Sequence, residues 1–163
     1  MLCRLSWTAV GRDVVVTVTL KHKIYAYITY ANRLLIFRHV DGPDAGIQVP
    51  GGTIEEGEVP DQAVMREAFE ETGLQGLRMR AFLGDTLHAF PEHGVTHHRY
   101  YYHLVCDEMP SECWRHDELD PSDGSPAPIT FEFTWASLPA GVPELIGDLD
   151  EMLPALVGLL ELE

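Results

Sequence analysis

The first half of the chain alternates between short apolar runs and polar breaks, which predicts β-strands. Residues 24–30 (IYAYITY) and 34–38 (LLIFR) are rich in aromatic and branched side chains, and residues 31–33 between them suit a hairpin turn. Residues 14–20 (VVVTVTL) form a similar run and are expected to add a further strand. This half of the protein is therefore expected to contribute adjacent strands to a sheet.

The remaining pattern predicts further strands and two helical segments. Residues 149–160 place apolar side chains at helical spacing, with Pro154 expected either to kink or to restart the helix. Strands are expected at 47–49, 77–83, 99–106 and 129–135, a polar turn at 92–98, a long loop at 107–128 and a helix at 60–72. This order of elements predicts the α/β class of α+β type, with a mixed sheet between helices.

The segment 60–72 (PDQAVMREAFEET) has the signals of an amphipathic helix. Pro60 suits the first turn, and Gly73 is a natural C-terminal stop. At about 100° per residue, one face is expected to pack on the core and the other to be polar. The expected core face holds Val64, Met65, Ala68, Phe69 and Thr72, and the polar face holds Ala63, Arg66, Glu67, Glu70 and Glu71.

Three glutamates on the expected polar face carry an electrostatic cost. Glu67 lies three and four positions before Glu70 and Glu71, and each like-charge pair costs roughly 0.2–0.5 kcal/mol. All three lie towards the negative end of the helix dipole, and Arg66 offsets one charge. A divalent cation would remove the conflict, since carboxylate oxygens favour Mg²⁺ or Mn²⁺ over zinc. The charge pattern alone leaves a metal site and a solvated face open.

The overall charge narrows the range of partners. The chain has 26 Asp and Glu against 11 Lys and Arg, a formal net charge of -15, which disfavours DNA, RNA and anionic lipid. There is no run of membrane-spanning length and no signal-peptide pattern. The cysteines at 3, 106 and 113 form no CxxC pair, which fits a reducing compartment and disfavours structural zinc. We therefore expect a cytoplasmic protein that binds neither a membrane nor a nucleic-acid polymer.

The spacing of Gly52, Glu58 and residues 66–74 (REAFEETGL) resembles the Nudix box, the signature of the Nudix hydrolase family. Every fixed position of that 23-residue pattern is filled, and "LLIFR", "QVPGG" and "FTWASLP" outside the box also resemble the family. The resemblance implies one Nudix domain over 1–163, with a mixed sheet between helices and a catalytic loop–helix–loop. Residues 1–20 are left open between an N-terminal extension and an extra strand.

The resemblance also implies roles for the residues of the box. A bound Mg²⁺ or Mn²⁺ is expected, with Glu67, Glu70, Glu71 and the Gly51 carbonyl as ligands. Glu58 and Arg66 are expected to support catalysis by orienting those carboxylates. The general base is left open between Glu67 and a later acid, Glu118 first, with Asp117, Asp120 and Glu132 as further candidates. Arg38 and Arg99 are candidates for contacting the substrate phosphates.

The implied function is a metal-dependent pyrophosphohydrolase acting on a small nucleotide. A nucleoside diphosphate derivative is expected, with ADP-ribose or a nucleotide sugar first and a nucleoside triphosphate second; Pro91, 17 residues beyond Leu74, favours the former. The alternative is a non-catalytic nucleotide-binding or sensor module of the same fold, and the isomerase branch of the superfamily is a third option. A homodimer is expected from the habit of the family and the apolar strand 14–20.

The tyrosines and histidines of the 97–102 segment suggest no separate site. Tyr100, Tyr101 and Tyr102 are interpreted as packing in the sheet rather than as a platform for stacking bases. A second metal site at His97 and His98 is not expected, because neighbouring residues of a strand point to opposite faces.

Overall fold

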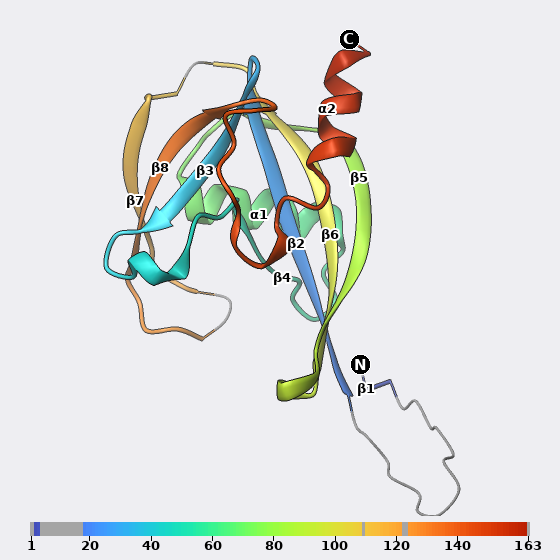
Figure 1. The fold of residues 1–163 in the computed structure, drawn as a ribbon. Coiled ribbons are helices and arrows are strands. Elements are labelled where there is room, and N and C mark those ends of the chain that lie inside the picture. The colour runs from blue at the N-terminus through green and yellow to red at the C-terminus, as the bar shows by residue number, and fades with distance from the viewer. Residues whose placement is uncertain (1, 4–17, 109, 122–123, 163) are drawn as a thin grey trace, which may run out of the picture.

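The computed structural model describes residues 2–3, 18–108, 110–121 and 124–162, which form a curved sheet flanked by helices (Figure 1). The strands are β1 (Leu2–Cys3), β2 (Val18–Tyr30), β3 (Arg33–His39), β4 (Gly51–Thr53), β5 (Leu77–Phe90), β6 (Val95–Cys106), β7 (Cys113–Glu118) and β8 (Ile129–Ser137). The helices are α1 (Pro60–Thr72) and α2 (Leu153–Glu161), with single 3₁₀ turns at Pro43–Ala45, Pro91–His93 and Ile146–Asp148.

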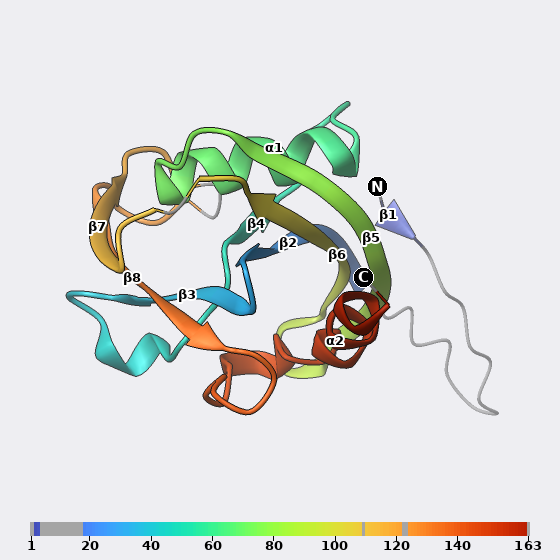
Figure 2. The ribbon, with the colours of Figure 1, turned by 90° about the horizontal axis from the view of Figure 1, so that it is seen from above.

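The sheet is mixed, as expected. Its strand order is β5-β6-β2-β3-β8-β7, with β1 and β4 also paired to β2. The β2–β6 pair is parallel, whereas the other pairs are antiparallel. Seen from above, α1 and α2 lie on opposite sides of β2 and β6 (Figure 2). The predicted fold class, a mixed sheet between helices, is confirmed.

Alternation along β2 divides the core between the two helices. Ile24 and Ile28 point to the cluster that contains Val64 and Ala68 of α1. Tyr27 points to the other cluster, which contains Leu156 of α2, and its hydroxyl donates to the carbonyl of Leu149 at 2.6 Å. β2 is therefore the central support of both layers.

The ends of the helices follow the signals in the sequence. Pro60 stands in the first turn of α1, and Gly73 closes the helix at φ 70°, with its N–H donating to the Phe69 carbonyl at 2.9 Å. Pro154 stands in the first turn of α2, which begins at Leu153. Of the two alternatives for Pro154, the structure shows the start of a helix. No helix in the described part of the chain is long and apolar enough to cross a membrane.

Several predicted strand boundaries are wrong. Residues 18–20 begin β2 instead of forming a separate strand, and residues 14–17 lie outside the described part of the chain. The predicted strand 47–49 is reduced to a single bridge between Gln48 and Phe37, while β4 follows at Gly51–Thr53. Local apolar runs locate strands but do not set where pairing with a neighbour begins and ends.

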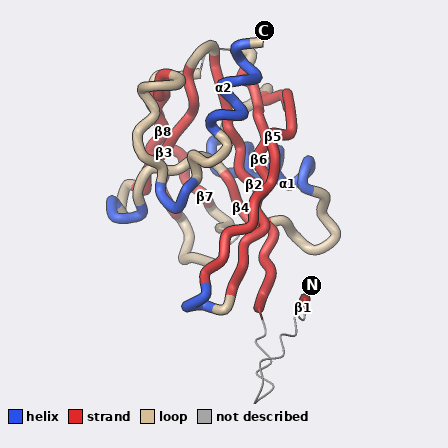
Figure 3. The backbone as a smooth tube through the Cα atoms, turned by 45° about the vertical axis from the view of Figure 1, so that its right-hand side comes forward, coloured by secondary structure: helices blue, strands red, loops and turns tan. Residues whose placement is uncertain are grey.

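The second half contains more sheet than its polar sequence suggests. β5 and β6 pair as one long hairpin from Leu77↔Cys106 to Phe90↔Val95, so most of the predicted turn 92–98 is strand. The hairpin extends beyond the helices (Figure 3). The predicted loop 107–128 contains β7, which pairs with β8 and ends at Glu118. In both places pairing between strands outweighs the polar composition.

Candidate active site

Helix α1 buries two of its glutamates against the sheet. Glu67 is 1% exposed and Glu71 is 6% exposed, whereas Phe69 is 49% exposed. The predicted division of the helix into a core face and a polar face is therefore wrong for these three residues, and also for Ala63, which was assigned to the polar face and is buried. The buried positions of α1 are Ala63, Val64, Glu67, Ala68, Glu71 and Thr72. Their spacing is that of one helical stripe, so the acids belong to the packed side of the helix.

Three buried carboxylates meet at this side of α1. One carboxylate oxygen from each of Glu67, Glu71 and Glu118 lies within 4.8 Å of the others. Glu118 is 6% exposed and is the last residue of β7, which is the edge strand at one end of the sheet. Burial raises the pKa of Glu71 well above its usual value, and repulsion from Glu118 and Glu67 raises it further. The cluster therefore favours a bound cation or a proton.

The glycines of β4 allow this close approach. The Gly51 N–H donates to Glu71 Oε2 at 2.9 Å, which favours the charged carboxylate. A Cβ added at Gly52 would lie 2.1–2.3 Å from the carboxylate atoms of Glu67, far inside contact distance. Glycine at 52 is therefore required for Glu67 to reach the cluster. The predicted role of the Gly51 carbonyl as a metal ligand stays a prediction.

Arg66 connects the loop before α1 to the glutamates of the helix. Its Nε and Nη2 donate to the two oxygens of Glu58 at 2.9 and 2.8 Å, and its Nη1 lies 3.0 Å from Glu67 Oε1 and 3.1 Å from Glu70 Oε2. The two hydrogen bonds from Arg66 to Glu58 lower the pKa of Glu58 below its usual value. Arg66 thus fixes the direction of the Glu67 carboxylate and holds Glu58 ionised beside it.

Glu70 lies at the edge of the cluster. Its side chain is 43% exposed, and it is not one of the three carboxylates that converge. It lines a 230 Å³ cavity together with Glu118, Asp117 and Asp120, so the structure brings it near the acid at the end of β7. Among the later acids that the sequence suggested, Glu132 lies elsewhere, where Arg38 and Arg115 both donate to it.

The two arginines proposed for phosphate binding have other contacts. Arg38 pairs with Glu132 on the strand next to its own. Arg99 is buried, donates to the Gly147 carbonyl at 2.6 Å and lies over the Tyr25 ring, 5.8 Å from its centre. Neither is among the described residues that line the cavity at the cluster. Arg99 instead ties the segment before α2 to the sheet.

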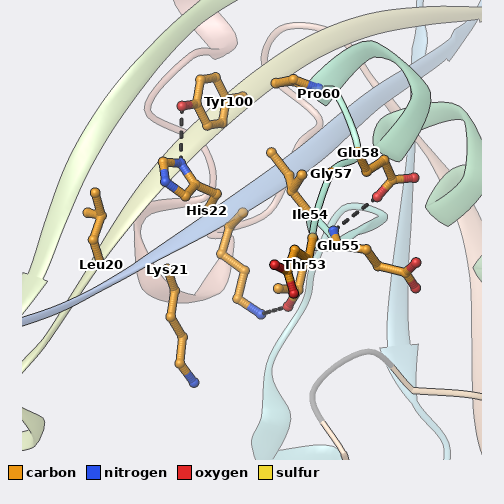
Figure 4. Close-up of a pocket in the computed structure, with 12 residues that line it drawn as sticks. Leu20, Lys21, His22, Thr53, Ile54, Glu55, Gly57, Glu58, Pro60 and Tyr100 are labelled. Carbon is orange, nitrogen blue, oxygen red and sulfur yellow. Dashed lines mark hydrogen bonds between the residues drawn. The ribbon is translucent and has the colours of Figure 1, made fainter. Parts of the chain in front are cut away.

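The cavity at the cluster shows residues that the sequence analysis missed. It encloses about 160 Å³ and is lined by Lys23, Tyr25, His39, Gln48, Gly51, Gly52, Glu71, Glu118, Ile129 and Phe131. Lys23 donates to Thr53 Oγ1 at 2.6 Å and also lines a larger pocket of about 880 Å³. Figure 4 shows this larger pocket, with Thr53 among its lining residues. The sequence placed Lys23 just outside the strand 24–30. Its position follows only once β2 is known to start at Val18.

The metal-free cluster is expected to make part of the stability depend on pH. The pKa of Glu71 in the folded state lies above its usual 4.5. The folded protein is therefore more stable at low pH, where Glu71 is protonated, and it loses this stability as the pH rises through the folded pKa. Glu71→Gln removes this titration. In urea unfolding with EDTA, the free energy of unfolding of the variant should therefore rise relative to that of the unchanged protein as the pH increases above 4.5. A difference that does not vary with pH would contradict this.

Comparisons with known proteins agree with the fold and the box. Residues 21–139 match the family model of the NUDIX domain. Among solved structures, a MutT NUDIX hydrolase from Burkholderia pseudomallei has a TM-score of 0.62 at 20% identity, covering 85% of this chain and 98% of that one. A UDP-X diphosphatase has a TM-score of 0.59 at 18% identity, covering 88% and 64%. A NUDIX hydrolase from Nitrosomonas europaea has a TM-score of 0.59 at 18% identity, covering 86% and 90%.

The family match covers most of the chain and includes the whole box, from Gly52 to Leu74. The similar solved structures are only 18–20% identical to this chain, so they support the fold alone. The chain therefore belongs to the Nudix hydrolase family, as the spacing of its glutamates, glycines and arginine predicted.

Proposed function

We propose that this protein is a metal-dependent pyrophosphohydrolase that cleaves the diphosphate linkage of a nucleoside diphosphate derivative. The observation that carries the proposal is the convergence of Glu67, Glu71 and Glu118, all buried and with oxygens within 4.8 Å of one another. Three buried carboxylates this close together are costly to hold ionised, and Arg66, with its Nη1 3.0 Å from Glu67 Oε1, offsets one of the charges. A divalent cation offsets that cost and gives the cluster a chemical use.

The residues present fit Mg²⁺ or Mn²⁺. All three side chains offer hard oxygen ligands, and the glycine at 52 leaves room for the Glu67 carboxylate among them. Glu67, Glu71 and Glu118 would hold the ion, with Glu70 at the edge of the site. When bound, the ion would neutralise the charge of the diphosphate and lower the pKa of the attacking water.

The chain's own residues orient the reacting groups. Arg66 holds the Glu67 carboxylate through its Nη1, and the Gly51 N–H holds Glu71. Lys23 lines both the cavity at the cluster and the larger pocket beside it, so we assign it the contact with the substrate phosphates. This replaces Arg38 and Arg99, whose contacts lie elsewhere. A cation at this point lets an acidic protein receive an anionic substrate.

Among the acids that follow the box, Glu118, the last residue of β7, is the best candidate for the general base. It belongs to the cluster, whereas Asp117 accepts from Thr130 Oγ1 and Glu132 is paired with two arginines. Glu67, which shares the cluster, is the other candidate. A water held at the cluster would pass its proton to one of these two carboxylates.

Replacing Glu118 with Gln is expected to lower turnover by about tenfold to a thousandfold, on the scale of general base catalysis and lost electrostatic stabilisation. Glu132→Gln is the matched control, because it makes the same change on the paired strand β8, outside the cluster. Steady-state rates at saturating Mg²⁺ should leave the control within about threefold of the unchanged protein. Equal rates for both variants would exclude Glu118 from the chemistry.

ADP-ribose or a nucleotide sugar is the first substrate class, and a nucleoside triphosphate the second. The ranking rests on Pro91, 17 residues beyond Leu74, which favours ADP-ribose-type substrates. The likeness to a UDP-X diphosphatase, at 18% identity, bears on the fold alone. The test is a panel of nucleoside diphosphate sugars, ADP-ribose and nucleoside triphosphates with Mg²⁺, Mn²⁺ or EDTA. Metal-dependent phosphoanhydride cleavage of at least one compound is expected. Binding without any turnover would favour the non-catalytic module instead.

A further inference from the structure

A chain of four hydrogen-bonded side chains crosses β5, β6 and β2 outside the acidic cluster. Asp85 Oδ2 lies 2.5 Å from His98 Nε2, and His98 Nδ1 lies 3.0 Å from the Tyr100 hydroxyl. The same hydroxyl lies 3.2 Å from His22 Nδ1. The rings of His98 and Tyr100 stack with their centres 4.3 Å apart, which holds the chain in register. Residues 97–102, which suggested no separate site in the sequence, are therefore connected by hydrogen bonds to His22.

The protons in this chain have one consistent arrangement when Asp85 is ionised and both imidazoles are neutral. A carboxylate only accepts, so His98 must donate from Nε2, and its Nδ1 then accepts from Tyr100. Since the tyrosine proton is used there, its oxygen must accept from His22 Nδ1. A neutral His22 then carries no proton on Nε2. The chain thus makes this nitrogen a hydrogen-bond acceptor.

His22 stands at a pocket beside the acidic cluster. His22 and Tyr100 line the 880 Å³ pocket, and Figure 4 shows them across from Ile54, Glu58 and Pro60. Lys23 lines both this pocket and the cavity at the cluster. No residue in the described part of the chain bonds to His22 Nε2. A molecule with its diphosphate at the cluster would have to extend past Lys23 to reach this pocket.

We propose that this pocket receives the organic half of the substrate, and that His22 Nε2 accepts a hydrogen bond from a hydroxyl or amino group on it. This inference rests on the proposed function. Burial of His22 lowers its pKa, which agrees with a neutral ring. An unprotonated Nε2 would repel a phosphate oxygen, because both would be acceptors. In this arrangement His22 contacts the sugar or base, and Lys23 contacts the phosphates.

The first test separates a contact with the organic half from a contact with phosphate. His22→Phe keeps an aromatic ring and removes the acceptor, so KM for ADP-ribose should rise by about fivefold to tenfold, the scale of one hydrogen bond. The inhibition constant of inorganic diphosphate, which has no organic half, should stay within about twofold. His93→Phe, at an exposed position on the turn after β5, is the matched control and should change neither. A His22→Phe variant that behaves like the control would overturn the proposal, as would equal weakening of both ligands.

The second test reads the proton arrangement without turnover. Nitrogen NMR of the full chain at about pH 8 should show His22 protonated on Nδ1, and Tyr100→Phe, which keeps the ring but breaks the chain, should release this preference. ADP-ribose should shift the Nε2 resonance of His22 in the unchanged protein. An Nε2-protonated His22, or no shift at saturating ADP-ribose, would contradict the subsite. Absence of turnover with an intact Nε2 shift would contradict the proposed function and leave the subsite supported.

Discussion

Replacing Glu71 with Gln is expected to lower turnover of the preferred diphosphate substrate by about a hundredfold or more. The amide keeps the shape of the side chain and can still accept the Gly51 N–H bond, but it removes one of the three buried charges. Losses of this size are typical when a charged group acting on the transition state is removed. Initial rates at saturating Mg²⁺ measure the change.

The same variant is expected to be more stable than the unchanged protein when no metal is present. Its neutral side chain avoids the burial and repulsion that raise the pKa of Glu71. Thermal melting should therefore shift upward in EDTA and respond less to added Mg²⁺. Glu70→Gln is the matched control, because it alters the adjacent, 43% exposed acid that pairs with Arg66. It should cost about tenfold or less in rate. A Glu71→Gln variant with full turnover and an unchanged metal response would contradict the role assigned to the cluster.

Gly52→Ala is expected to lower turnover by about a hundredfold through a single methyl group. The added Cβ would lie 2.1–2.3 Å from the Glu67 carboxylate, so that carboxylate must move away from Glu71 and Glu118. Displacements of about 1 Å within a catalytic site typically cost about this much. The measurement is the rate with Mg²⁺, together with the melting temperature in EDTA to confirm that the variant folds.

Gly158→Ala makes the same chemical change where there is room for it. Gly158 lies in α2, and a Cβ there would meet nothing within 4 Å. Alanine in place of glycine inside a helix stabilises by roughly 0.5–1 kcal/mol, so this variant should melt slightly higher and keep its activity. If Gly52→Ala were as active as Gly158→Ala, the close packing of Glu67 against β4 would not matter for catalysis.

The features that the sequence predicted correctly are those set by neighbouring residues. Pro60 and Gly73 mark the ends of α1 because the first turn and the left-handed stop depend on local backbone geometry. The box is also a local pattern, since it lies within residues 52–74, and its spacing predicted the family. The strands 24–30 and 34–38 are contained within β2 and β3, since local apolar runs are enough to locate a hairpin.

The features that the sequence missed depend on contacts between distant segments. Glu118 joins Glu67 and Glu71 because β7 pairs with β8, with Glu118 opposite Ile129, and nothing in the polar run before Pro121 marks that pairing. Periodicity alone assigned Phe69 to the core, although it is half-exposed. The arrangement arises because β4 offers glycine backbone, and not apolar side chains, to the side of α1 that carries the acids.

The most direct test of the central claim is Mn²⁺ binding, followed by electron paramagnetic resonance of the free ion. The claim is that Glu67, Glu71 and Glu118 together form the metal site. The unchanged protein should bind Mn²⁺, and Glu71→Gln and Glu118→Gln should each bind it at least about tenfold more weakly. Glu132→Gln, outside the cluster, should bind as the unchanged protein does. Equal Mn²⁺ affinity in all four proteins would contradict the claim.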